Sequence, residues 1–448
     1  MTTSPLRSAG RWLSRGDTVS VVSQTALTRV FLLLVNFATG VLIARFLGTT
    51  GRGELSALII LPPLMSSLFT FGLPSALLFY ARTGESERKS LFTIAMALTA
   101  ALSALMIVAG IAVVPHMLNH YDAETIRAAQ WLLLLAPEIM LSYIIASFLQ
   151  AAGRFGQFNQ QRYLPAVVTL AGLIALKSIG MLTPLSAALS YLLPPLPVFV
   201  YTLWRMRDII GISFVNARDV AKRLLRYGAR ACGIDILGTV AQQADQVLVV
   251  GLLSAASMGL YTVALSVSRV PNLIFNAMSD VIASKAIGMP PVEMTALVGR
   301  AARLTALGGA VFGILIAATL PFALPLFYGS EFGPAVIITD ILLVEILASG
   351  ISSILALSFL ATGHPGIVTI VRGGSLLIVV PLLFVLIPHF ALVGAACALL
   401  VSSASRVVAF ALLYRSAVGT PAPSLILTRD DIRFVANRLR RRIAYVSA

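Results

Sequence analysis

The sequence contains few charged residues: Asp, Glu, Lys and Arg together make up 11% of its 448 residues. Soluble domains carry about 25% charged residues, so an ordinary soluble enzyme or binding domain is excluded. In place of charge the chain has 58% hydrophobic residues, and apolar runs long enough to cross a bilayer recur along its length. Short segments of alternating apolar and polar residues, typical of a transmembrane β-barrel, are not found. The sequence therefore predicts an all-α polytopic membrane protein.

Cysteine is also scarce, with Cys232 and Cys397 as the only two in the chain. Both lie within apolar runs, where thiols behave as small hydrophobic groups, so a disulfide framework is not expected. The chain has no ATP-binding motif, no glycine-rich phosphate loop and no long polar loop that would hold catalytic residues. The sequence therefore predicts neither a cofactor nor an enzyme.

Twelve predicted membrane spans account for the apolar runs, and no loop between them is long enough to form a separate soluble domain. The first six are predicted at residues 18–46, 54–80, 90–114, 126–150, 163–181 and 184–204, and the second six at 224–252, 257–283, 303–327, 334–361, 366–388 and 391–414.

The distribution of basic residues predicts the orientation of these spans. In a soluble protein the net charge of +15 would indicate nucleic acid binding. Here 25 of the 33 Lys and Arg residues fall in cytoplasmic segments if both termini are cytoplasmic, counting those at span edges, which are Arg162, Arg226, Arg303 and Arg372. Three are assigned to the opposite loops, namely Arg45, Arg52 and Arg127. Basic residues collect on the cytoplasmic side of membrane proteins. We therefore expect a multi-pass protein of the cell inner membrane with cytoplasmic termini and no nucleic acid partner.

The sequence repeats weakly within itself. VLIARFLGTTGRGELSALIIL at 41–61 returns as VLVVGLLSAASMGLYTVALSV at 247–267, after a shift of 206 residues with no gap. FLQAAGR at 148–154 and FLATGHP at 359–365 correspond at a shift of 211 residues. Two echoes at nearly the same shift indicate a duplication of six spans, so the two halves would have the same orientation in the membrane.

The duplication predicts two six-helix lobes around a central cavity. Gly53 and Gly259 are predicted to mark the turn into the second helix of each half. The predicted segments are a cytoplasmic N-terminal segment (1–17), an N-lobe (18–204), a basic cytoplasmic linker (205–223), a C-lobe (224–414) and a basic cytoplasmic tail (415–448). The tail pattern fits either an amphipathic interfacial helix or a disordered segment.

Three segments carry a resemblance to a known family: LIARFLGTTGRGELSAL at 42–58, FLQAAGRFGQFN at 148–159 and GLYTVA at 259–264. Their order and spacing resemble the multidrug/oligosaccharidyl-lipid/polysaccharide exporter superfamily, and within it the polysaccharide (O-antigen, Wzx-like) flippase branch. The resemblance covers about residues 16–415. Twelve predicted spans differ from the fourteen typical of the lipid II flippase branch.

The resemblance implies a flippase that exposes a central cavity alternately to the two membrane faces. Its substrate would be a polyprenyl-diphosphate-linked oligosaccharide, moved outward for O-antigen, lipopolysaccharide or exopolysaccharide synthesis. A polysaccharide polymerase and chain-length proteins are the implied protein partners. The energy source stays open between the membrane potential, an ion gradient and consumption of the product.

Besides the arginines counted at span edges or in loops, four lie inside predicted spans: Arg29, Arg230, Arg269 and Arg406. A charge inside a span costs a few kcal/mol or more, so it faces a partner or a wet cavity. The guanidinium group binds phosphate oxygens through two parallel hydrogen bonds and stays charged when desolvated. The four arginines are therefore candidate substrate-binding residues, and structural pairing or snorkelling is the alternative. The resemblance adds weight to Arg29 and Arg269, because cationic residues on spans one and eight recur in flippases.

Acidic residues inside the predicted spans are Glu138, Asp235, Asp245, Asp340 and Glu345. These carboxylates would either neutralise nearby arginines or bind a coupling cation. At the 206-residue shift Arg29 corresponds to Asp235. We hypothesise that these two side chains approach each other across the cavity when one of its two openings closes.

Two other functions remain in competition with the flippase. A multidrug-type cation antiporter of the same superfamily would need an acidic cavity rather than an arginine-bearing one. A membrane enzyme of polysaccharide assembly would need a polar domain that this chain lacks. His116 and His120 are four residues apart, a spacing compatible with metal binding. They lie in an exposed polar loop, so we do not expect a metal site there.

Overall fold

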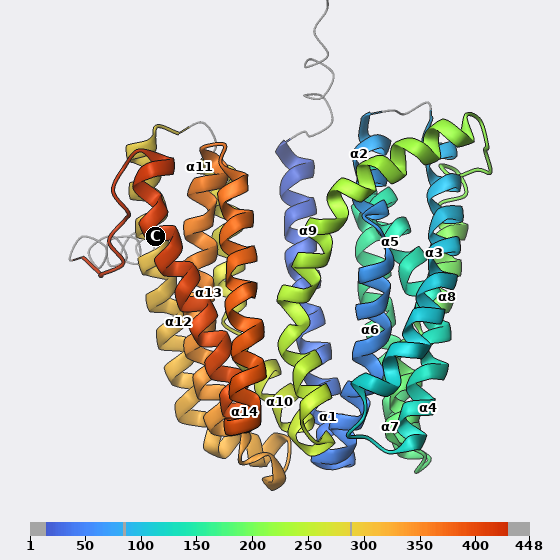
Figure 1. Cartoon of the computed structure of the whole chain (residues 1–448), viewed down its shortest axis with the longest axis horizontal. Helices are drawn as coiled ribbons and strands as arrows, with labels where there is room; N and C mark the ends of the chain where they lie inside the picture. The colour runs from blue at the N-terminus through green and yellow to red at the C-terminus, as the bar shows by residue number, and fades with distance from the viewer. Residues whose placement is uncertain (1–14, 84–86, 287–288, 429–448) are drawn as a thin grey trace, which may run out of the picture. The chain divides into compact units, whose positions relative to one another are not determined.

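The computed structural model describes residues 15–83, 87–286 and 289–428. In these residues the regular structure consists of α-helices and two short 3-10 turns, without a β-strand (Figure 1). The predicted all-α membrane fold class is confirmed. The cytoplasmic segment before residue 15 and the tail after residue 428 lie outside the described residues.

Seven helices of the described chain are long and apolar enough to cross a membrane. Two of them contain a sharp change of direction. Helix α1 (Arg15–Phe69) bends at Gly48, with φ 67° and ψ −171°. Helix α14 (Pro365–Val418) bends at Ala391, with φ 48° and ψ −128°. Each bend falls at the boundary between two spans that the sequence predicts, so α1 and α14 each cover two of the predicted spans.

The chain forms two compact units, of which unit 1 comprises Met1–Gln243 with Ser254–Gly259. Beyond α1, its helices are α2 (Leu73–Thr83), α3 (Arg88–Met117), α4 (Ala123–Leu132), η4 (Leu133–Leu135), α5 (Ala136–Ala151), α6 (Phe155–Ser178), α7 (Pro184–Leu192), α8 (Pro195–Arg205) and most of α9 (Ala217–Leu252).

The start of α9 packs onto one core of unit 1. Val220 and Leu224 are one turn apart on α9, and both are fully buried. They join a cluster that includes Leu77 of α2, Leu91 of α3 and Phe148 of α5. Helix ends in unit 1 follow local sequence signals: Thr183 caps α7 through Ser186, with Pro184 at the first helical position.

Unit 2 comprises Ala244–Leu253 with Leu260–Ala448. Its other helices are α10 (Ala255–Ser268), which begins in unit 1, α11 (Asn272–Ala286), α12 (Pro291–Phe327), η5 (Ser330–Phe332), α13 (Ala335–Ala361) and α14. Helix α13 lies alongside α12, α11 and α14 (Figure 1). A buried core joins Phe275, Val298, Phe359 and Phe410 from these four helices. This packing brings α13 and α14 close enough for their polar residues to meet.

The predicted position of the first-hairpin turn is wrong. The chain turns at Gly48, and its counterpart at the 206-residue shift, Ser254, lies in the break between α9 and α10. Gly53 and Gly259 lie five residues later, inside helices. A positive φ is needed at Gly48, whereas Gly53 and Gly259 are placed where two backbones approach closely. The division into lobes and their duplication stay predictions.

Candidate functional site

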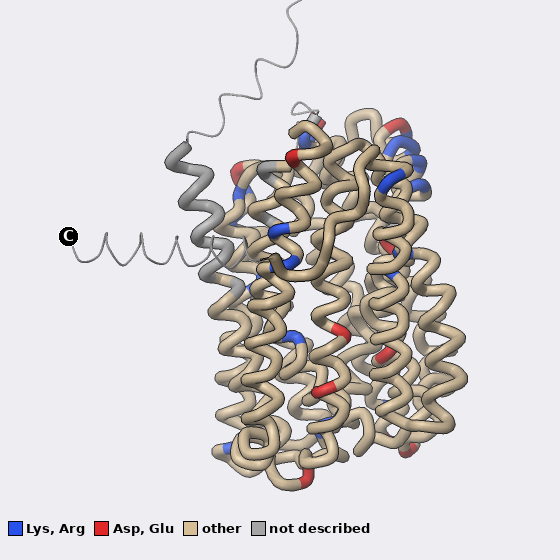
Figure 2. The backbone as a smooth tube through the Cα atoms, turned by 90° about the vertical axis from the view of Figure 1, so that its left-hand side faces the viewer, with Lys and Arg blue, Asp and Glu red and all other residues tan. Residues whose placement is uncertain are grey.

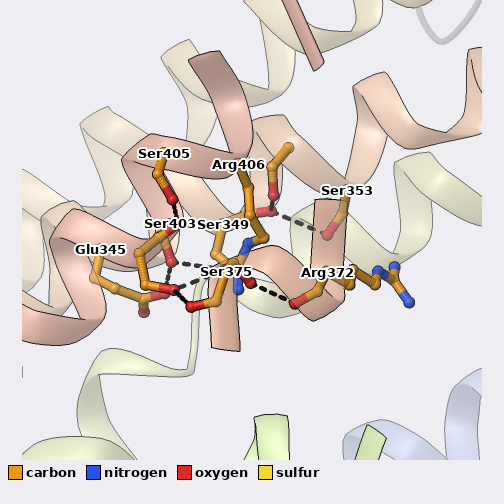
Figure 3. A network of polar contacts seen from close by, with 10 residues as sticks. Glu345, Ser349, Ser353, Arg372, Ser375, Ser403, Ser405 and Arg406 are labelled. Carbon is orange, nitrogen blue, oxygen red and sulfur yellow. Dashed lines mark hydrogen bonds and ion pairs between the residues drawn. The ribbon is translucent and has the colours of Figure 1, made fainter. Parts of the chain in front are cut away.

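Arg406 and Glu345 form the centre of a polar network in unit 2 (Figure 3). Arg406 Nη2 lies 4.0 Å from Glu345 Oε1. The same nitrogen donates hydrogen bonds to Ser403 Oγ at 2.7 Å and to Ser349 Oγ at 3.3 Å. Ser403 in turn donates a short hydrogen bond to Glu345 Oε1. The hydroxyl of Ser403 thus bridges the two charged side chains of α13 and α14, and Ser349 of α13 adds a second hydrogen bond to Arg406.

The spacing of the residues explains how the network forms. Glu345 and Ser349 are one turn apart on α13, and Ser403 and Arg406 are one turn apart on α14, so each pair shares a helix face. Further serines satisfy backbone carbonyls of the same helices, as when Ser353 donates to the carbonyl of Ser349 at 2.9 Å. In a bilayer core such groups have no water to bind, so these internal hydrogen bonds make the polar residues tolerable.

Arg372 of α14 lies within electrostatic range of Arg406. Its guanidinium group points away from that of Arg406, and the Arg372 side chain is exposed (Figure 3). Its carbonyl accepts a hydrogen bond from Ser375 at 2.8 Å. Arg372 therefore adds a second positive charge near the Arg406–Glu345 pair, with its side chain turned away from that pair.

A second acid of unit 2 is held by a tyrosine. Tyr261 of α10 donates a hydrogen bond to Asp245 Oδ2 at 2.8 Å. Both residues are buried, with 3% of Asp245 and none of Tyr261 exposed. Arg269, in the turn after α10, lies within electrostatic range of both Asp245 and Glu345. We call Asp245, Arg269, Glu345 and Arg406 the unit 2 charge cluster; it contains two acids and two arginines.

The other predicted site residues do not join this cluster. In unit 1, Asp235 of α9 accepts a hydrogen bond from Ser75 at 3.2 Å, and buried Glu138 of α5 accepts one from Ser142 at 2.5 Å. Arg230 is exposed on α9. Arg29 lies on α1, and its side chain is outside the described residues, so the hypothesis that it meets Asp235 stays a prediction. Figure 2 shows how sparsely such charges occur along the helices.

Sequence reasoning missed the uncharged partners in the unit 2 charge cluster and, separately, a buried arginine in unit 1. The partners Tyr261, Ser349 and Ser403 carry no charge, and the only signal for the serines was their one-turn spacing from a charged residue. Arg52 was assigned to an outside loop, but it is 6% exposed, and its Nε and Nη1 atoms have no hydrogen-bond partner among the described residues. In the part of the chain that the structure describes, no group of three His, Cys, Asp or Glu could hold a metal ion.

Residues 42–337 match a protein family described as polysaccharide biosynthesis protein. The chain belongs to the polysaccharide biosynthesis protein family. Among curated protein sequences none matches the chain.

Solved structures show the fold of this family member. The lipid II flippase MurJ, in an inward closed conformation, is 15% identical with a TM-score of 0.73, over 94% of this chain and 92% of that chain. An inward-facing multidrug resistance MATE transporter of the MOP superfamily is 14% identical with a TM-score of 0.71, over 88% and 98% of the two chains.

A MOP superfamily transporter from Pyrococcus furiosus, described as having a binding pocket of reverse polarity, is 13% identical. Its TM-score is 0.55, over 88% of this chain and 96% of that chain. At these identities the likeness shows the fold alone. The polysaccharide biosynthesis protein therefore has the MOP superfamily fold, as the resemblance in its sequence implied.

Proposed function

We propose that this protein is a flippase that moves a polyprenyl-diphosphate-linked oligosaccharide from the cytoplasmic to the outer face of the cell inner membrane. Both chain termini would be cytoplasmic, and the glycan would be a repeat unit for O-antigen, lipopolysaccharide or exopolysaccharide synthesis. A polysaccharide polymerase and chain-length proteins would act on the product. Translocation breaks no covalent bond, so the protein would act as a transporter rather than an enzyme.

This proposal rests on the two arginines of the unit 2 charge cluster, Arg269 and Arg406. They occur in a chain that belongs to the polysaccharide biosynthesis protein family. Arg406 lies within a membrane helix, where an ionisable side chain usually marks a substrate or ion pathway. Asp245 and Glu345 balance the two arginines while no substrate is bound. A lipid diphosphate would compete with these carboxylates for the same guanidinium groups, since phosphate oxygens bind arginine in the same bidentate geometry.

Arg29 and Arg230 belong to the same proposal as further diphosphate ligands. Arg230 is exposed on α9, where its side chain is available to a polar headgroup. Glu138 and Asp235, each bonded to a serine hydroxyl, would serve as pairing partners or ligands of a coupling cation.

A cation antiporter is the second candidate, because Asp245 is a buried acid that could bind a cation and multidrug MATE transporters share the fold. The charge of the binding pocket would distinguish the two functions. In the Pyrococcus furiosus transporter, a binding pocket of reverse polarity suggests a different function of that protein. An antiporter would depend on Asp245 and Glu345, whereas a diphosphate flippase would depend on Arg269 and Arg406.

The test is an extraction of lipid-linked glycans from cells that lack the protein. We expect a complete polyprenyl-diphosphate repeat unit to accumulate on the cytoplasmic leaflet. The wild-type protein should relieve this accumulation, and Arg269→Ala/Arg406→Ala should not.

Arg218→Ala is the matched control, since Arg218 is exposed on the first turn of α9, outside the spans predicted from the sequence. This variant should relieve the accumulation like the wild type. Unchanged lipid-linked glycans together with altered resistance to cationic compounds would overturn the flippase and favour the antiporter.

A further inference from the structure

The part of the basic linker that precedes α9 is fastened to the start of α3 (Figure 1). Ser90 Oγ of α3 donates a hydrogen bond to the carbonyl of Val215 at 2.7 Å, and Thr93 Oγ1 donates one to the carbonyl of Gly211 at 3.0 Å. The backbone N–H of Ser213 donates a hydrogen bond to Thr93 Oγ1 at 3.2 Å. These hydrogen bonds hold a short non-helical stretch of chain in a fixed position on unit 1.

The fastened stretch presents apolar side chains outward. Ile212 is 88% exposed, Phe214 is 63% exposed and Val215 is 68% exposed. Ile209 and Ile210, a few residues earlier in the same linker, instead pack against the buried core of unit 1. The three exposed side chains cannot turn inward unless the backbone gives up its hydrogen bonds to α3. Such a patch is unfavourable in water, so we expect an apolar partner to cover it.

The exposed face of α8, which leads into the linker, indicates that this partner is lipid. Val200, Tyr201 and Trp204 are exposed on α8, and α8 belongs to one of the candidate membrane spans. The ring centres of Tyr201 and Trp204 lie 6.3 Å apart, and the guanidinium carbon of Arg207 lies 5.0 Å from the Trp204 ring centre. Aromatic and basic side chains of this kind collect where a bilayer meets water. The linker therefore leaves α8 at the level of the lipid headgroups.

Basic side chains flank the exposed apolar residues. Lys89 of α3 lies against the linker, since a methyl group built on Gly211 would stand 3.2 Å from Lys89 Cδ. Arg207 lies at the other end of the stretch, on the side of α8. The neighbouring acid, Asp208, is engaged by a hydrogen bond from Arg154. The first two turns of α9 that follow contain more basic than acidic residues, so the positive charge is not balanced locally.

We propose that this surface is a docking site for an anionic phospholipid. The apolar linker surface consists of Ile212, Phe214 and Val215 with Lys89 and Arg207. An acyl chain lies against the three apolar side chains, and the two cations attract the phosphate headgroup. A zwitterionic phospholipid has the same acyl chains, but its own ammonium group balances its phosphate, so the site prefers the anionic lipid. Under the predicted orientation this lipid lies in the cytoplasmic leaflet. The site is independent of the cargo that the protein transports.

The site is tested by fluorescence quenching in the full-length protein in lipid nanodiscs. A bimane label is attached in a Phe214→Cys/Cys232→Ser/Cys397→Ser parent, so that an apolar group remains at position 214. Phosphatidylcholine nanodiscs receive increasing fractions of phosphatidylglycerol or phosphatidylcholine brominated in the same acyl chain. We expect the fraction that gives half-maximal quenching to be about fivefold lower, or lower still, for the anionic lipid, because one basic residue near the surface contributes about that factor. The difference should shrink as the salt concentration rises.

Neutral variants test the two cations. Lys89→Gln/Arg207→Gln should bring the two half-maximal fractions together, whereas the conservative Lys89→Arg/Arg207→Lys should keep them apart. Arg127→Gln/Lys177→Gln is the matched control, because it removes the same charge from exposed positions on α4 and near the end of α6. It should keep the preference of the parent. If the doubly neutralised variant does not fold, Lys89→Gln and Arg207→Gln should each lose part of the preference.

Equal half-maximal fractions for the two brominated lipids in the parent would overturn the docking site. A label that neither lipid quenches, but that aqueous iodide does, would also overturn it, since the surface would then face water or a partner protein. Loss of the preference in Arg127→Gln/Lys177→Gln would assign it to the overall charge of the protein and would count against the site as well.

Discussion

Arg406 of α14 and Glu345 of α13 are joined through the hydroxyl of Ser403, which bonds to both side chains. The direct distance between the charged atoms is 4.0 Å, so the serine rather than a close ion pair connects them. A hydroxyl bridge of this kind keeps the arginine in place and leaves its remaining donors to other ligands. Under the proposed function, a lipid diphosphate would replace Glu345 as the partner of this arginine.

Removal of Arg406 should destabilise the protein. Arg406→Leu leaves the Glu345 carboxylate in the helix pair with the hydroxyl of Ser403 as a hydrogen-bond donor but without its arginine, and the loss of stability should be about 1–3 kcal/mol. The measurement is thermal unfolding in detergent micelles. Arg406→Leu/Glu345→Leu should recover most of the loss, because no unpaired charge remains. Additive losses in the double variant would contradict the coupling of the two residues.

Tyr261→Phe should also lower the thermal stability. The hydroxyl of Tyr261 is the side-chain donor to buried Asp245, and a buried acceptor that loses its donor costs about 1–3 kcal/mol. Asp245→Asn should cost less than Tyr261→Phe, because an amide oxygen can still accept the tyrosine hydrogen bond while the charge is removed. Equal unfolding temperatures for Tyr261→Phe and wild type would show that the hydrogen bond contributes nothing.

Arg52→Met should raise the stability. Arg52 is buried with two unpartnered nitrogens, and its counterpart at the 206-residue shift, Met258, is 1% exposed. Replacement of a buried guanidinium group that has unsatisfied donors by an apolar side chain of similar length should raise the stability by about 1–3 kcal/mol. Thermal unfolding in detergent is again the measurement. A lower unfolding temperature for Arg52→Met would mean that the guanidinium group contributes favourable contacts in the folded protein.

The ion pair between Arg154 and Asp208 predicts a pH dependence in the connection before α6. The hydrogen bond from Arg154 holds the pKa of the Asp208 carboxyl below its usual range. A lowered pKa in the folded state contributes stability above the unfolded pKa of about 3.9, and this stability is lost as the pH falls through the lowered value.

The effect should be small because both side chains are partly exposed. Asp208→Asn should be slightly less stable than wild type at neutral pH, and this difference should disappear as the pH falls below the lowered pKa of Asp208. Unfolding curves of the two proteins from neutral to acidic pH give the comparison. A constant difference between them at every pH would contradict the role of the ionised carboxylate.

Much of the fold follows from hydrophobicity alone. The apolar run predicted at 334–361 is α13 (Ala335–Ala361), because a bilayer-crossing segment must satisfy its backbone hydrogen bonds internally. The turn of the first hairpin was misplaced by five residues. The stretch GTTGRG offers three glycines, and only the tertiary structure shows that Gly48 needs a positive φ while Gly53 needs a close neighbour.

The site was predictable only in part. Charged residues inside apolar runs identified Arg269, Arg406, Asp245 and Glu345, because charge is rare enough there to stand out. Their grouping could not be predicted, since Glu345 and Arg406 lie 61 residues apart and meet only through the packing of α13 on α14. The burial of Arg52 was missed for the same reason, because burial of a side chain near a turn depends on what packs over it.

The most direct test of the account is transport by the purified protein in vesicles. Polyprenyl-diphosphate oligosaccharide is placed in both leaflets, and the fraction accessible to an added glycan-modifying enzyme is followed in time. We predict that vesicles with the wild-type protein make the inner-leaflet pool accessible, while empty vesicles and vesicles with Arg269→Ala/Arg406→Ala do not. An equal rate for the arginine variant and the wild type, or no rate above empty vesicles for either, would contradict the account.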